Sequence, residues 1–331
     1  MSADSPSLES KVAFLRDLCG RSDEAIETHF AWVFLTGERA WKLRKPVRRG
    51  TMDYQSLEAR RLDSLLEVRL NRRLAPQTYL GAVPLTLRRD GGYALGGDGE
   101  VADWLVCMRR LDRSRLLDVQ LSQRALGAHA LRPLVGLLSG FYGAAEPAIT
   151  DGPAFVARIG RQIAANQQVL ATSGLDGVDA LGAAQRRFLA TREGWLARRA
   201  VDGCVVEAHG DLRPEHIFLE DPPCVIDCLE FDRDLRLLDR AEELCFLELE
   251  CARFDDAQVG HQLLRACLDA LGDTAPDRLL SFYRSHRAAT RAKLYVWRAT
   301  EPNSGTPAQW LARAASYLGG AVADAERSLA R

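Results

Sequence analysis

Two aspartates in the segment VVEAHGDLRPEHIFLEDPPCVIDCLEF, residues 205–231, have a spacing that suits phosphoryl transfer. Asp211 follows one short apolar run and Asp227 ends the next, and we expect the two runs to form the arms of one hairpin. Moving a phosphoryl group from a nucleotide to a hydroxyl requires a carboxylate that orients the hydroxyl, a second that holds a divalent metal ion, and a lysine on the phosphates. The spacing predicts the first role for Asp211 and the second for Asp227.

The lysine of such a site is predicted in the segment RAWK, residues 39–42. Because side chains alternate along a strand, Ala40 and Lys42 share one face. The small side chain of Ala40 would leave room for adenine, and the amine of Lys42 would bind the phosphates. The charged, periodic stretch that follows reads as a helix and offers Glu67 as the best partner to hold Lys42 extended, with Glu58 as the rival.

The rest of the chain predicts the elements that position these residues. Residues 6–19 have helical spacing, 30–47 read as a hairpin, 53–74 as a long helix, and 83–111 as three strands joined by glycine-rich turns. From about residue 111 onward the pattern is helical, apart from the hairpin expected at 205–231.

Strands first and helices afterwards indicate an α+β chain with two lobes. We predict an N-lobe over 1–108, an antiparallel sheet with one inserted helix, and a mainly helical C-lobe over 109–331 that carries the catalytic loop, metal site and acceptor site. Met108, at the boundary, joins the candidates for nucleotide binding.

Composition excludes several other classes. The net charge of −1 argues against a nucleic-acid partner, and no apolar run is long enough to cross a membrane. An acidic N-terminal segment and eight cysteines without a C-x-x-C pair predict a cytoplasmic protein with reduced thiols. No lysine follows a glycine, which excludes a P-loop. GGYALGGDG precedes a strand-like segment, so a hairpin turn is favoured over a dinucleotide site.

Five segments carry a resemblance to a known group of enzymes: WVFLTGERAWKLRKPV, LEVRLNRRLAPQTYLGAVPL, HGDLRPEHIFL, VIDCLEFDRDLRLLDRAEELCFLELE and YRSHRAATRAK. In this order they resemble the aminoglycoside-phosphotransferase-like branch of the protein-kinase-like superfamily. Within it, the chain is most similar to a bacterial family whose members sometimes carry an additional P-loop kinase domain. We therefore expect a stand-alone member without that domain.

The resemblance implies a protein-kinase-like bilobal fold with a five-stranded N-lobe, a helical C-lobe, and ATP with Mg²⁺ in the cleft between them. Carried over by position, Asp211 would orient and deprotonate the acceptor, and Asp227 would bind metal. His209 would pack beneath the catalytic loop, and Asp239 would brace that loop by accepting backbone N–H bonds.

His216 departs from the family pattern, which has a metal-binding asparagine five residues after the catalytic aspartate. An imidazole replaces an oxygen donor with nitrogen, which Mg²⁺ disfavours. Three readings stay open: a kinase that uses one metal ion or prefers Mn²⁺, a kinase whose His216 contacts Asp211 or phosphate directly, and a nucleotide-binding pseudokinase or protein-interaction module. The retention of Lys42, Asp211 and Asp227 favours an enzyme.

The acceptor is predicted to be a small molecule that carries a hydroxyl, with a sugar or other polar metabolite favoured over an aminoglycoside. Ten carboxylates within 230–256 suit a cationic acceptor, although we favour the interpretation that they form a solvated helix face. One of them, Glu230, is expected to be an exposed loop residue rather than a metal ligand. A stripe of arginines at 284, 287, 291 and 298 suits an anionic acceptor, or pairs with the acidic helix before it. Any separate protein partner is left open.

Overall fold

The computed structural model describes residues 6–20, 25–50, 52–124, 126–127, 129–254, 257–301 and 305–330. The chain divides into two compact units, of which unit 1 comprises Met1–Leu116 with His216–Arg233, and unit 2 comprises Leu117–Glu215 with Asp234–Arg331. The sequence predicted a single division after residue 108. The segment from His216 joins unit 1 because Phe218 and Cys224 are buried in the same hydrophobic cluster as Ala40.

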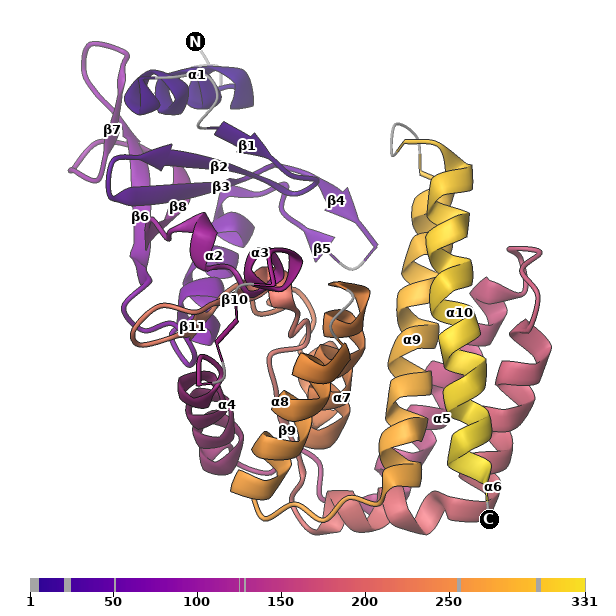
Figure 1. The fold of residues 1–331 in the computed structure, drawn as a ribbon. Coiled ribbons are helices and arrows are strands. Elements are labelled where there is room, and N and C mark those ends of the chain that lie inside the picture. The colour runs from indigo at the N-terminus through magenta and orange to yellow at the C-terminus, as the bar shows by residue number, and fades with distance from the viewer. Residues whose placement is uncertain are drawn as a thin grey trace. The chain divides into compact units, whose positions relative to one another are not determined.

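Unit 1 is built on a six-stranded sheet in which neighbouring strands are antiparallel (Figure 1). The expected hairpin at 30–47 is present, with Gly37 in the left-handed region at its turn. The resemblance implied five strands, whereas the sheet has six, of which the two at its edges are short. In spatial order the strands are β1 (Ala25–Glu27), β2 (Ala31–Thr36), β3 (Arg39–Arg44), β8 (Val101–Arg109), β6 (Tyr79–Leu87) and β7 (Tyr93–Leu95).

Two helices cover the two faces of this sheet. Helix α1 (Leu8–Cys19) packs Leu15 against Phe34 and Leu105 of the sheet, and helix α2 (Leu57–Asn71) packs Val68 against the opposite face. The predicted helix at 53–74 is shorter because the Ser56 side chain accepts a hydrogen bond from the backbone N–H of Ala59 and caps its start.

The predicted hairpin over 205–231 was wrong. Its first run, β9 (Val205–Glu207), pairs with β12 (Leu237–Asp239) in unit 2, and only the second half forms a hairpin, from β10 (Ile217–Phe218) and β11 (Cys224–Val225) in unit 1. Periodicity identified both apolar runs as strands but could not choose their partners, which lie elsewhere in the sequence. A further pair in unit 1 joins β4 (Arg48–Arg49) to β5 (Met52–Asp53).

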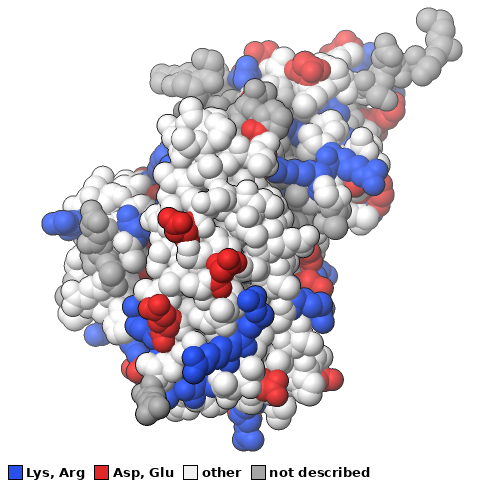
Figure 2. All heavy atoms as spheres, turned by 90° about the vertical axis from the view of Figure 1, so that its right-hand side faces the viewer, with Lys and Arg blue, Asp and Glu red and all other residues white. Residues whose placement is uncertain are grey.

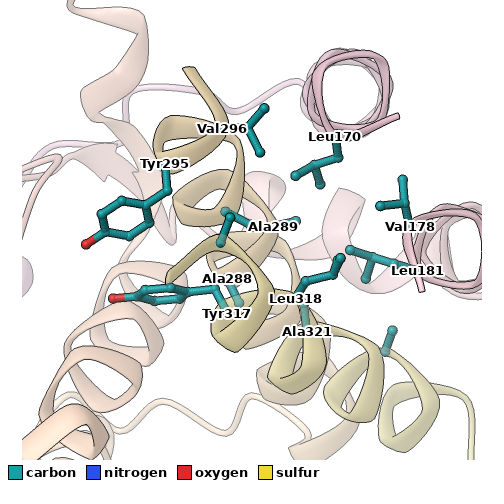
Figure 3. Packing of buried hydrophobic residues seen from close by; sticks show 13 residues of the cluster. Leu170, Val178, Leu181, Ala288, Ala289, Tyr295, Val296, Tyr317, Leu318 and Ala321 are labelled. Carbon is teal, nitrogen blue, oxygen red and sulfur yellow. The ribbon is translucent and has the colours of Figure 1, made fainter. Parts of the chain in front are cut away.

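Unit 2 is mainly helical, which confirms the α+β class. Its helices are α3 (Leu117–Ser122), α4 (Arg132–Ala144), α5 (Gly152–Leu170), α6 (Val178–Val201), α7 (Arg240–Cys251), α8 (Ala257–Ala270), α9 (Asp277–Ala299) and α10 (Pro307–Leu329). Ala289 on α9 packs in one hydrophobic cluster with Leu318 and Ala321 on α10, where the two helices meet (Figure 3). Among the described residues, no helix combines the length and apolar character needed to cross a membrane.

The core of unit 1 yields a stability prediction. Leu105 lies on β8 and is fully buried, whereas Leu80 on β6 is 38% exposed. We expect Leu105→Ala to lower the free energy of unfolding by about 2–5 kcal/mol, because it removes buried methyl groups and leaves a cavity. Leu80→Ala, the matched strand control, should stay within about 0.5 kcal/mol of the wild type. Urea denaturation of both variants measures the difference, and equal losses would contradict the assigned burial.

Candidate active site

Lys42 lies on β3, on the same sheet face as Ala40, and is held by two carboxylates. Its Nζ is 2.7 Å from Oε1 of Glu67 on α2 and 3.3 Å from Oδ1 of Asp227. The rival Glu58 is exposed on α2 and binds Arg61 instead. The structure therefore brings three residues that the sequence singled out into one cluster within unit 1.

The charges of this cluster stabilise one another. Burial alone would lower the pKa of Lys42, but Glu67 and Asp227 outweigh burial and raise it above its ordinary value. Lys42 in turn is the main cause that holds the pKa of Asp227 well below its usual range, against the opposing effect of burial. Both side chains are therefore charged at neutral pH, as phosphate binding and metal binding require.

The backbone at Asp227 is fixed in an unusual conformation. Its φ of 61° lies in the left-handed region, which asparagine and aspartate tolerate better than most residues. The N–H of Asp227 donates to the Tyr79 hydroxyl oxygen at 3.2 Å, and the next N–H, of Cys228, donates to Oδ1 of Asn71 at 2.8 Å. Asn71 also donates to the backbone oxygen of Glu67 at 2.9 Å, so α2 and β6 together hold the loop that carries Asp227.

His216 lies directly before β10 and is buried beside Asp227. Its Nε2 is 3.6 Å from Oδ2 of Asp227, and its backbone oxygen accepts a hydrogen bond from Ile226 N–H, which belongs to the hairpin formed by β10 and β11. Half of the Asp227 side chain is exposed, whereas that of His216 is buried. An ionised carboxylate oxygen that solvent can reach therefore lies close to an imidazole nitrogen. This donor set fits a divalent cation, and the nitrogen suits transition metals better than Mg²⁺.

Met108 and Ala40 are opposite each other on β8 and β3. Both are buried, and both belong to the hydrophobic cluster in which Val68 and Phe218 also lie. These positions place apolar side chains on the same sheet face as Lys42.

Sequence reasoning missed Arg44 and misjudged Glu230. Glu230, expected to be exposed, is buried and binds the guanidinium of Arg44. Asp63, Glu67 and Glu230 place carboxylate oxygens within 4.8 Å of one another, a grouping that resembles a metal site, but Arg44 binds all three. The signal available in the sequence was strand alternation, because Arg44 follows Lys42 by two positions on the same face.

Unit 2 carries the loop of Asp211, which follows β9. The Asp211 carboxylate accepts a hydrogen bond from Nε of Arg213 at 3.0 Å and is partly exposed. His209 is fully buried, and its Nδ1 accepts the N–H of Asp211 at 3.3 Å. Gly210 has a φ of 93°, a conformation that side-chain-bearing residues rarely adopt, so the turn between His209 and Asp211 depends on glycine.

The backbone of this loop is braced by a different carboxylate from the one expected. The N–H groups of His209 and Gly210 donate to Glu243 on α7, whose pKa is raised by burial although these bonds and Tyr142 oppose the shift. Asp239, to which the resemblance gave these bonds, instead caps α7 through Ala241 N–H and binds Arg199, with both oxygens at 2.6 Å. Glu243 follows Asp239 by four residues, about one turn of helix.

The acidic and basic stretches of unit 2 largely neutralise each other. Glu242, Glu243 and Glu250 are fully buried rather than on a solvated face. Arg284 binds Glu248 and Asp324, and Arg291 lies 3.5 Å from Glu250. These two arginines therefore pair with the acidic helix α7, which was one of the two interpretations of the arginine stripe.

On the molecular face of Figure 2, acidic and basic side chains are scattered among uncharged ones and neither sign dominates the residues shown in colour. This distribution agrees with the small net charge of the chain.

Comparison with known sequences gives relatives but no family. No family model matches the chain. Uncharacterized proteins of Mycobacterium bovis and Mycobacterium tuberculosis are 34% identical to it over 277 residues, which cover 81% of this chain and 53% of each relative. The chain thus spans about half the length of these relatives.

Solved structures decide the fold. The chain matches the GDP and kanamycin complex of the aminoglycoside phosphotransferase APH(2″)-IIIa with a TM-score of 0.55 and 16% identity, over 95% of this chain and 98% of that one. The chain has the aminoglycoside phosphotransferase fold. The same fold is found in the GDP complex of wild-type aminoglycoside 2'-phosphotransferase-IIIa (TM-score 0.54, 14% identity, 96% and 99% coverage). A putative aminoglycoside phosphotransferase from Ralstonia eutropha also shares it (TM-score 0.51, 12% identity, 97% and 98% coverage).

In this aminoglycoside phosphotransferase fold, the choice between the two candidate glutamates can be tested directly. We expect Glu67→Ala to weaken ATP binding about tenfold or more, because Lys42 loses the carboxylate that holds it extended. Glu58→Ala removes only an exposed pair with Arg61 and should leave the affinity unchanged. Titration calorimetry with ATP and MnCl₂ gives both values. Equal affinities in the two variants would show that the pair with Lys42 does not serve nucleotide binding.

Proposed function

We propose that this protein is an ATP- and divalent-metal-dependent phosphotransferase that acts on a hydroxyl group of a small molecule. The observation that carries the proposal is the position of Lys42, 2.7 Å from Glu67 and 3.3 Å from Asp227. A partly buried cation between two carboxylates, on the same sheet face as apolar side chains, is the arrangement that binds nucleotide phosphates in kinases. The fold supports the same class of activity.

Each residue of unit 1 has a role in this proposal. Lys42, held extended by Glu67, would bind the phosphates of the donor nucleotide. Asp227, with His216 beside it, would hold the divalent ion. When bound, that ion offsets the negative charge of the phosphates and so stabilises the transferring group. Tyr79 and Asn71 would keep Asp227 in place through the hydrogen bonds to the backbone of its loop.

Asp211 of unit 2 would orient the acceptor hydroxyl and accept its proton. The acceptor oxygen then forms a bond to the γ-phosphorus while the bond from that phosphorus to the oxygen bridging to the β-phosphate breaks, in line and without a covalent enzyme intermediate. Arg213, hydrogen-bonded to Asp211, would hold the carboxylate in one orientation. The hydrogen bonds from the loop backbone to Glu243 would fix the position of Asp211 in unit 2.

The proposed phosphoryl donor is a purine nucleoside triphosphate, and the proposed acceptor is a small polar molecule. GDP and kanamycin are ligands of proteins that share the fold at 16% identity or less, so GTP is to be tested beside ATP. Because Glu242, Glu243 and Glu250 are buried, they do not form an exposed acidic surface for a cationic acceptor. A sugar or other polar metabolite is therefore the acceptor class we propose, with the cytoplasm, where ATP is available, as the compartment.

Nucleotide titrations of the wild type and of Asp227→Ala test the proposal. We expect ATP binding that strengthens when Mg²⁺ or Mn²⁺ is added, and we expect Asp227→Ala to lose that gain because the ionised oxygen ligand is gone. Calorimetry with and without a divalent ion gives the affinities. Absence of nucleotide binding under all conditions would reject a phosphotransferase and leave a protein-interaction module as the explanation of the fold.

Transfer itself is tested at Asp211. In an assay that follows ATP consumption with a panel of sugars and polar metabolites, we expect Asp211→Ala to lower kcat by about a hundredfold or more while the affinity for ATP stays unchanged. Activity that survives the substitution would remove Asp211 from the role of base. Binding of nucleotide without transfer to any acceptor would favour the pseudokinase.

His216 decides which metal ion is used. We expect His216→Asn to shift the metal preference of ATP binding toward Mg²⁺, because an amide oxygen replaces the imidazole nitrogen 3.6 Å from Asp227. The measurement is the ratio of ATP affinities in Mg²⁺ and Mn²⁺. His261→Asn, at an exposed histidine of α8, is the matched control and should leave the ratio unchanged. The same ratio in all three proteins would show that His216 is not a metal ligand.

A further inference from the structure

Arg44 binds carboxylates from two separate parts of unit 1. On α2 it contacts Asp63, with 2.6 Å between Nε and Oδ2, and Glu67, with 2.7 Å between Nη2 and Oε2. The same Nη2 binds Oε1 of Glu230, which follows Asp227 by three residues. One guanidinium thus connects the helix that holds Lys42 to the segment that carries Asp227.

This connection is buried, which makes its geometry demanding. The side chains of Arg44, Asp63, Glu67 and Glu230 are each at most 9% exposed. A buried carboxylate without a cation is costly, and the removal of one partner from a buried ion cluster destabilises the others strongly. The planar fork of arginine can contact several carboxylates at once, whereas lysine offers a single point charge. The cluster therefore depends on arginine in particular.

Glu67 is shared between two basic residues of β3, Lys42 and Arg44. Its Oε1 is bound to Lys42 and its Oε2 to Arg44. A change at Arg44 consequently removes the ion pair to one oxygen of Glu67, the carboxylate that holds Lys42. It also removes the ion pair between Arg44 and Glu230, near Asp227. In protein kinases both the lysine–glutamate pair and the metal-binding aspartate must be in place for transfer. Arg44 contacts Glu67 of the first and, beside the second, Glu230, which follows Asp227 by three residues.

We propose that Arg44 is a positioning residue that links the Lys42–Glu67 pair to the Asp227 segment, so that phosphate and metal are bound by one preassembled arrangement. Arg44 acts through Glu67 and Glu230 and does not itself contact the nucleotide. The inference rests on the proposed function and adds to it a dependence that the sequence pattern did not show.

The test compares a charge-balanced variant with a matched control. Arg44→Gln with Glu230→Gln removes one cation and one anion together, which keeps the net charge of the cluster although Asp63 loses its ion pair, and Arg44→Lys keeps the charge but removes the fork. Arg60→Lys is the control, because Arg60 is also buried, lies on α2 and binds Asp103 rather than the site. Thermal denaturation of each variant shows that it is folded before nucleotide is added.

The first readout is the gain in ATP affinity on addition of MnCl₂, measured by calorimetry. We expect this gain in affinity to be about tenfold smaller in Arg44→Lys and in the double variant than in the wild type. Arg60→Lys should keep the wild-type gain even if its melting temperature falls. A gain that is reduced equally in all variants would overturn the inference, because it would report general loosening of unit 1.

The second readout does not require nucleotide. Acylation of lysines with acetic anhydride, followed by peptide mass spectrometry, compares Lys42 with Lys11, a lysine of the same unit that is paired with Asp103. We expect acylation of Lys42 relative to Lys11 to rise severalfold in the double variant, because Glu67, without Arg44 on its Oε2, holds the amine less firmly in one position. An unchanged ratio would overturn the inference. A rise in a protein that binds no nucleotide would uphold the link and reject only the proposed function.

Discussion

The two oxygens of Glu67 are the point on which unit 1 depends. One binds Lys42 and the other binds Arg44, so a single side chain on α2 holds two cations of β3 side by side. The carboxylate is fully buried, and α2 is further tied to the Asp227 loop through Asn71. Loss of a buried ionic partner costs far more than loss of an exposed one, so this constraint leaves the helix little freedom to move away from the strand.

Unit 2 uses a comparable principle with a different set of contacts. Glu243 is buried on α7, and it accepts the N–H groups that the backbone presents on either side of the turn at Gly210. Asp239 and Arg199 form a second buried pair at the start of the same helix. In both units, a polar side chain on a helix accepts backbone N–H groups of a loop that presents an aspartate: the Asn71 amide on α2 in unit 1 and the Glu243 carboxylate on α7 in unit 2.

The sequence was informative wherever a residue's neighbours lie close to it in the chain or follow a simple period. Strand alternation was enough to place Ala40 and Lys42 on one face, and helical spacing was enough to find α1 and α2.

It failed where the deciding contact was distant in sequence. The burial of Glu230 depends on Arg44, 186 residues earlier, and the partner of β9 is a strand that begins after the expected hairpin has ended. Choosing Glu67 over Glu58 required only the register of one helix, whereas recognising Glu243 required knowledge of where the loop at Gly210 would lie.

The division of the chain also has a consequence for the order in which it can fold. Unit 1 is discontinuous, because residues 117–215 of unit 2 separate its sheet from the hairpin that carries Asp227. A growing chain that has completed the sheet and α2 already holds the buried carboxylates Asp63 and Glu67, but it still lacks Glu230 and the apolar cover of Phe218. During synthesis the six-stranded sheet is therefore complete before residues 117–215 are made, and until the hairpin of β10 and β11 follows, the intermediate exposes the apolar residues that Phe218 later covers.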